Sequence, residues 1–208
     1  MNIKTTLKKY KNLGDYFAPD YAQENDALNE FKKGNPNLSK DQTIELINLL
    51  DNNSDINDKY FVADLLYLYD NFDKELIEPL LNAAINHRDT SFNRVFLNPC
   101  LRTFGVGVIA NHLADRFNKV DIDERIGILK LVYWLRPLEG CEVDKLHETI
   151  IKRANNTSNL IELYHYKLQY SNKIKNETEI PDSADDLIKV IKGNKEYEDL
   201  LFGKLGWK

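Results

Sequence analysis

The residue types that most often carry enzyme chemistry are scattered along this sequence instead of gathered in motifs. The four histidines lack the HExxH or paired spacing of zinc ligands; they are His87, His112, His147 and His165. No GxSxG, Walker A or GxGxxG pattern occurs, and GVG at 105–107 is too short to cradle a phosphate. The sequence therefore indicates no catalytic residue, no metal site and no cofactor.

Paired carboxylates and the two cysteines have structural explanations. Asp121 with Asp123, and the aspartates at 185–186, stand where helices are expected to begin, and the positive end of a helix dipole stabilises negative charge there. Cys100 and Cys141 have no CxxC partner and lie in or beside apolar runs. We expect buried, neutral thiols in preference to a metal or redox role.

Arginine and aromatic side chains on expected helices are better candidates for function. Written at helical spacing, four helices each show a polar side opposite an apolar one. The last of them, over 158–169, presents Ser158, Glu162, His165 and Gln169. On the other three we predict partner-binding residues, which are Tyr60, Asp64, Tyr67, Arg94, Asn98, Arg102, Lys130 and Trp134. Tyr, Trp and Arg are enriched at binding hot spots, so Tyr67, Arg102 and Trp134 are the expected anchors.

The same side chains also fit a purely structural role. Arg94 and Arg125 can pair with acidic side chains of neighbouring turns in an internal ladder, and Tyr67 and Trp134 can simply contact adjacent helices. The apolar side of the helix that carries Trp134 is expected to include Ile126, Leu129 and Tyr133, which would leave Trp134 on the partner surface. Both interpretations stay open at this point.

Composition predicts a helical scaffold for these residues. The chain has 208 residues, 42% hydrophobic and 29% charged, which is enough for one sizeable core or a short repeat array. With only 9 Gly and 6 Pro it has little of the turn punctuation that an all-β fold needs. We therefore expect an all-α fold.

The stretch from Glu75 to Gly105 shows the repeating element most clearly. Apolar residues at 76, 77, 80, 81, 84 and 85 follow the i, i+3, i+4 pattern of a one-sided helix. Asp89, Thr90 and Ser91 then offer cap chemistry for a second helix, which Gly105 closes. Similar pairs begin near residues 39, 73, 105 and 142, a spacing of 32 to 37 residues that is typical of helical arrays.

The sequence from 76 to 105 resembles a HEAT repeat. The likeness lies in a proline early in the first helix, Pro79, an aspartate in the turn, an arginine entering the second helix, and a closing R-x-x-G from Arg102 to Gly105. It extends loosely over 39–172 and implies a right-handed stack of about four hairpins, with second helices lining the concave side. A plain helical bundle is the alternative.

The ends of the chain depart from the repeat. Residues 1–38 are expected to form an N-terminal helical cap, 39–172 the array, and 173–208 a linker followed by one C-terminal amphipathic helix. Phe202 and Trp207 are expected to dock against the last hairpin. No signal peptide or membrane-spanning run is evident, so a cytoplasmic location is expected.

Charge limits the class of partner. The formal net charge of −5 argues against general nucleic-acid binding. Residues 36–75 hold nine Asp and Glu against three Lys, whereas 76–136 hold six of the seven Arg.

The leading hypothesis is a non-enzymatic scaffold that binds a protein on its concave face. A specific version is an immunity protein that neutralises a basic toxin. The alternative, by resemblance in outline, is a HEAT-like alkylpurine DNA glycosylase.

Overall fold

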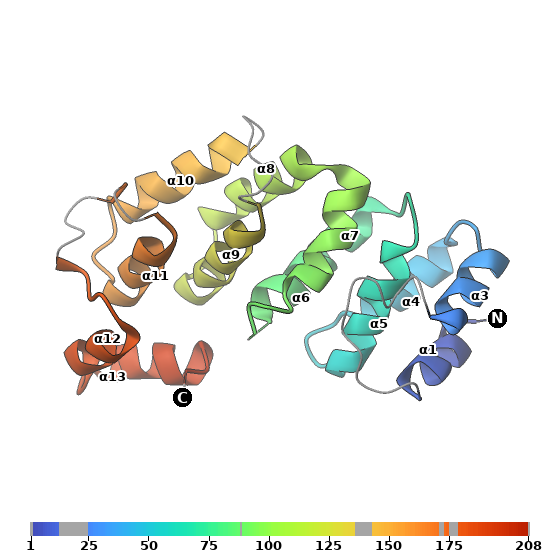
Figure 1. Cartoon of the computed structure of the whole chain (residues 1–208), viewed down its shortest axis with the longest axis horizontal. Helices are drawn as coiled ribbons and strands as arrows, with labels where there is room; N and C mark the ends of the chain where they lie inside the picture. The colour runs from blue at the N-terminus through green and yellow to red at the C-terminus, as the bar shows by residue number, and fades with distance from the viewer. Residues whose placement is uncertain are drawn as a thin grey trace. The chain divides into compact units, whose positions relative to one another are not determined.

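The fold is helical throughout the part of the chain that can be described. The computed structural model describes residues 2–12, 25–87, 89–135, 143–170, 173–174 and 179–207 (Figure 1). These residues contain helices and no strand, which confirms the predicted all-α class. None of the described helices is long and apolar enough to cross a membrane. The chain divides into two compact units, Met1–Gly105 and Val106–Lys208.

Unit 1 holds the N-terminal helices and the first two helical pairs. Its elements are α1 (Ile3–Lys11), α3 (Asp26–Gly34), α4 (Lys40–Leu49), α5 (Ile56–Tyr67), the 3₁₀ turn η1 (Lys74–Leu76), α6 (Ile77–Asn86) and α7 (Arg94–Phe104). Helix α5 contacts both α4 and α7, while α4 contacts η1, which runs directly into α6. Corresponding helices of the two pairs therefore pack against each other. Helices α1 and α3 contact one another and α5, as expected for a cap.

The ends of α7 show one correction and one confirmed prediction. The side chain of Asp89 accepts a hydrogen bond from the backbone N–H of Ser91 at 2.8 Å and stabilises a turn that continues to Asn93. The helix then begins at Arg94, later than predicted, because the cap-forming residues are used in this turn. Gly105 ends α7 with φ of +82°, a left-handed conformation that favours glycine.

Unit 2 repeats the same arrangement with two further pairs. They are α8 (Val106–Phe117) with α9 (Ile122–Leu135), and α10 (Asp144–Ala154) with α11 (Leu160–Tyr170). Helix α8 contacts α10, and α9 contacts α11. The C-terminal region forms α12 (Ala184–Ile191), α13 (Lys195–Glu198) and the π-helical stretch η5 (Asp199–Lys204). The predicted single C-terminal helix is wrong, because Gly193 interrupts it with φ of +87°.

A buried carboxylate joins α9 to α11 in unit 2. The side chain of Glu162 is 1% exposed and accepts hydrogen bonds from Arg125 Nε at 2.7 Å, Tyr166 Oη at 2.6 Å and Thr157 Oγ1 at 2.9 Å. Arg125 also donates to the carbonyl of Val120. Burial raises the pKa of Glu162, but the hydrogen bonds from Tyr166 and Arg125 and the charge of Arg125 outweigh it, so the net pKa is lowered. The carboxylate is therefore held in its charged form.

We predict that Glu162→Ala destabilises the protein by about 3 to 5 kcal/mol, because it leaves the Arg125 charge half-buried without its partner. The lowered pKa of Glu162 means that its stabilisation is present above the unfolded pKa and is lost as the pH falls through the folded pKa. Urea unfolding at neutral and acidic pH measures both effects. Glu148→Ala, an exposed change on α10, is the control and should stay within about 0.5 kcal/mol of wild type.

Candidate functional site

The first two predicted partner-binding residues, Tyr60 and Asp64, are buried inside unit 1. The Tyr60 hydroxyl lies 2.8 Å from Nε2 of His87, and its ring stacks on Phe96 with centroids 5.3 Å apart. Asp64 accepts a hydrogen bond from the hydroxyl of Tyr10 at 2.7 Å. Both residues are less than a tenth exposed, so neither lies on an open surface where a partner would meet it. They hold α5 against α1 and α7.

Arg102 and Tyr67 bind each other across α5 and α7. The Arg102 guanidinium lies 5.2 Å from the Tyr67 ring centroid, donates to the Tyr67 carbonyl, and donates to Oδ1 of Asp70 at 2.9 Å. The side chain of Arg102 is nevertheless 41% exposed. Tyr67 is half-buried, so this pair keeps a face toward solvent while already forming internal contacts.

Arg94 and Asn98 are half-buried on α7. Asn98 lines a gap of about 10 Å³ together with Asp64, Tyr67 and Val95. Such a gap has room for about one water molecule. The polar sides of α5 and α7 therefore face each other closely, and most of their polar groups are used within unit 1.

In unit 2, helix α9 has no separate polar side. Residues 126–129, 131, 132 and 135 are buried, so the helix is enclosed on most of its circumference. Trp134 is half-buried, whereas Tyr133, which we predicted on the apolar side, is 56% exposed. That assignment was wrong, because α9 packs on several sides and its buried positions do not follow one stripe. Lys130 is also half-buried.

Facing α9, helix α11 carries two polar side chains that sequence reasoning did not select as site residues. His165 is only 7% exposed, and its Nε2 has no hydrogen-bond partner in the described part of the chain. One turn later, the buried Oε1 of Gln169 is also without a partner there. The sequence could have indicated this pair, because the two residues stand at i and i+4 on the predicted polar side of the helix.

Burial determines the ionisation of this cluster. It lowers the pKa of His165 to about 4, and the positive charge of Lys130 contributes in the same direction. Burial also lowers the pKa of Lys130. Trp207 packs edge-on against Tyr164 and His165, with ring centroids 5.9 Å and 5.8 Å apart, so this residue docks on α11 as predicted. Phe202, which was predicted to dock with it, is 40% exposed.

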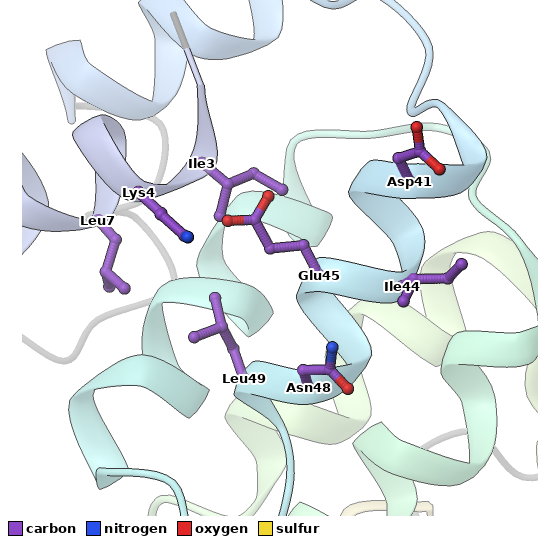
Figure 2. A pocket seen from close by; sticks show the side chains of 8 residues that line it. All are labelled: Ile3, Lys4, Leu7, Asp41, Ile44, Glu45, Asn48 and Leu49. Atoms are coloured by element: carbon purple, nitrogen blue, oxygen red, sulfur yellow. The ribbon is translucent and has the colours of Figure 1, made fainter.

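An open groove of about 560 Å³ lies between α1 and α4 in unit 1. Figure 2 shows Ile3, Lys4 and Leu7 on the α1 side, with Glu45 projecting from α4 toward Ile3 and Lys4. Figure 2 also labels the remaining lining residues on α4, which are Asp41, Ile44, Asn48 and Leu49. Ile44 is 45% exposed. The groove therefore combines apolar side chains with carboxylates on the α4 side.

Cys100 is a buried structural residue. Cys100 is fully buried, and burial raises the pKa of its thiol to about 12, so it is a neutral thiol as predicted. Cys141 lies outside the described residues. Within the ranges that are described, no three His, Cys, Asp or Glu side chains are grouped so that they could hold a metal ion.

Comparison of the chain with protein-family models, with curated proteins and with solved structures gives no match. The HEAT-like resemblance therefore stays a prediction that rests on the residues at 76–105. Any functional argument has to start from the geometry of the two units.

The buried carboxyl of Asp64 generates a pH-dependent prediction. Burial raises its pKa to about 7, although the hydrogen bond from Tyr10 opposes the shift. A raised folded pKa gives stability that is present below the unfolded pKa, near 3.8, and is lost as the pH rises through about 7. Asp64→Asn keeps an acceptor for Tyr10 without the charge. It should exceed wild type in stability at about pH 8, by up to about 4 kcal/mol, with a smaller gain at about pH 5.

Denaturant unfolding of both proteins across this pH range measures the gain. Glu30→Gln, which removes an exposed carboxylate of the same unit, should leave the pH profile of wild type unchanged. Parallel profiles for wild type and Asp64→Asn would show that Asp64 is not a buried titrating group.

Proposed function

We propose that this protein is a non-enzymatic, protein-binding scaffold whose unit 1 receives a basic amphipathic helix of its partner. The observation that carries the proposal is the groove between α1 and α4. Its volume of about 560 Å³ lies within the range of ligand-binding pockets, and it is open to solvent along two helices. An amphipathic helix laid into an apolar groove is a common mode of peptide recognition.

The charge around the groove favours a basic partner. Asp41 and Glu45 lie one turn apart on α4 and both line the groove, opposite the single lysine Lys4. They belong to the segment 36–75, in which nine carboxylates stand against three lysines. A helix with Leu or Ile on one face and Lys or Arg on its flank would match both the apolar lining and this charge.

The predicted HEAT-like array and the partner role of the second helices remain parts of this proposal. Support comes from the contacts of α5 with α7 and of α9 with α11, which are those expected of neighbouring repeats. Tyr67 and Arg102 keep an exposed face and stay predicted partner contacts, whereas buried Tyr60 and Asp64 act by holding the helices. Neutralisation of a basic toxin is the specific version that fits an acidic groove.

The glycosylase alternative draws little support from unit 1. An aspartate that handles a damaged base has to meet that base in a pocket. Asp64 is buried beside a gap of about 10 Å³, which has no room for a nucleobase. The scaffold is therefore the function that the described geometry supports best.

A pair of designed helical peptides tests the groove without a known partner. The first peptide carries leucines on one face and lysines on the other, and the second replaces every lysine by glutamate. Isothermal titration should show that the lysine peptide binds wild type and that the glutamate peptide does not. Asp41→Lys combined with Glu45→Lys should weaken binding of the lysine peptide by about tenfold or more at low salt.

A matched control uses the same spacing on another helix. Asp144 and Glu148 are exposed, one turn apart near the start of α10, so Asp144→Lys with Glu148→Lys changes the net charge equally but leaves the groove intact. This variant should bind the lysine peptide as wild type does, apart from a small general charge effect. Equal losses in the two double variants, or no binding to wild type, would contradict the proposal.

A further inference from the structure

Unit 2 contains two buried polar atoms that have no hydrogen-bond partner in the described part of the chain, and a half-buried lysine close to one of them. Nε2 of His165 and Oε1 of Gln169 are buried on α11 without a hydrogen bond in the described structure. Across from them, Lys130 of α9 is half-buried and forms no ion pair with any described carboxylate. Each of the two buried atoms lowers the stability of the fold, because its hydrogen bonds with water are lost and nothing replaces them.

The described carboxylates nearest in sequence to these groups are already engaged, and Lys130 forms no ion pair within the described part of the chain. Glu162, on the same helix as His165, is taken by Arg125, Tyr166 and Thr157. Asp123, at the start of α9, is approached by Lys204 at 3.5 Å. Lys130 nevertheless lies close enough to His165 for its charge to lower the pKa of that ring. The cation and the imidazole therefore share one local environment.

We infer that Lys130, His165 and Gln169 form a binding site for a carboxylate group, bordered by Trp207. One carboxylate would pair with the ammonium of Lys130 and accept from the imidazole and the amide, so that one ligand group satisfies all three. A neutral imidazole can carry its proton on Nε2, and the amide of Gln169 can turn its NH₂ toward the same point. A metal cation would instead be repelled by Lys130.

Trp207 lies at the edge of the proposed site, and its fluorescence can be used to detect a bound ligand. Its ring packs edge-on against His165 and Tyr164, so a ligand that reaches His165 must lie beside or displace the indole. The two tryptophans of the chain are Trp134, one turn after Lys130, and Trp207, and both belong to unit 2. Intrinsic tryptophan fluorescence therefore reports on this unit alone. The site uses no residue of the α1–α4 groove, so either proposal can fail without the other.

The site predicts an unusual stability pattern. Removing an unpaired polar group from a packed surface should stabilise the ligand-free protein, as happens when binding groups are replaced by apolar ones. Lys130→Met and Gln169→Leu should each raise the melting temperature by about 2 to 4 °C. Lys152→Met, which removes an exposed lysine from α10, is the matched control and should leave it unchanged.

Binding is tested with three defined probes at constant ionic strength. Acetate represents a free small carboxylate, N-acetylglutamate amide represents an acidic side chain in a peptide, and N-acetylglutamine amide is the neutral control. Wild type should show a saturable change in tryptophan fluorescence with at least one carboxylate and none with the neutral amide. Lys130→Met should weaken that binding by about tenfold or more, and Lys152→Met should not.

The outcomes separate the sources of the ligand. A response to both carboxylates supports a site open to peptide side chains, and a response to acetate alone supports a site for a free acid. The inference is overturned if neither carboxylate gives a saturable response in wild type, or if Lys130→Met responds as wild type does. It is also overturned if Lys130→Met and Gln169→Leu both lower the melting temperature while Lys152→Met leaves it unchanged, because the side chains would then have structural roles.

Discussion

The ion pair between Glu162 and Arg125 is the interaction on which unit 2 depends. It places a charged carboxylate that is 1% exposed between α9 and α11, and such burial is tolerated only because Arg125, Tyr166 and Thr157 satisfy it. Fixing these two helices at this point brings the next turns of both into register. Further along α11, His165 and Gln169 lack the partners that Glu162 has, and the charge of Lys130 acts on His165.

Both units satisfy some of their buried polar groups internally and leave others without a partner among the described residues. In unit 1, Tyr60 pairs with His87, Asp64 with Tyr10, and Arg102 with Asp70, whereas Thr103 Oγ1 of α7 is buried without a partner there. In unit 2, the corresponding face of α9 and α11 is satisfied at Glu162 and left unsatisfied one turn further on. Buried polar groups without partners are uncommon in native proteins, and in unit 2 two of them stand four residues apart on α11, with the charge of Lys130 close to His165, which is why we infer a ligand there.

Helical periodicity was enough to predict the all-α class, because several of the helices bury apolar residues at the i, i+3, i+4 spacing. It failed where packing is not one-sided: α9 is enclosed on most sides, so Tyr133 and Trp134 could not be assigned from a single stripe. Periodicity also missed the helix break at Gly193. A single glycine is tolerated within a helical pattern, and the sequence alone does not show that this one has a positive φ. The hydrogen-bond partners of Tyr60, Asp64 and Arg102 come from the end of α6, from α1 and from the loop after α5. A local sequence pattern cannot predict such long-range partners.

Titration of the Lys130 ammonium by side-chain NMR, with and without a saturating carboxylate, tests most directly whether unit 2 holds an unpaired cation that awaits an anion. Burial with no counter-ion among the described residues predicts a Lys130 pKa below the usual 10.5 in the free protein. The pKa should rise when the carboxylate binds, because an adjacent negative charge favours the ammonium form. A Lys130 pKa at its ordinary value in the free protein, or one that the carboxylate does not change, would contradict this account.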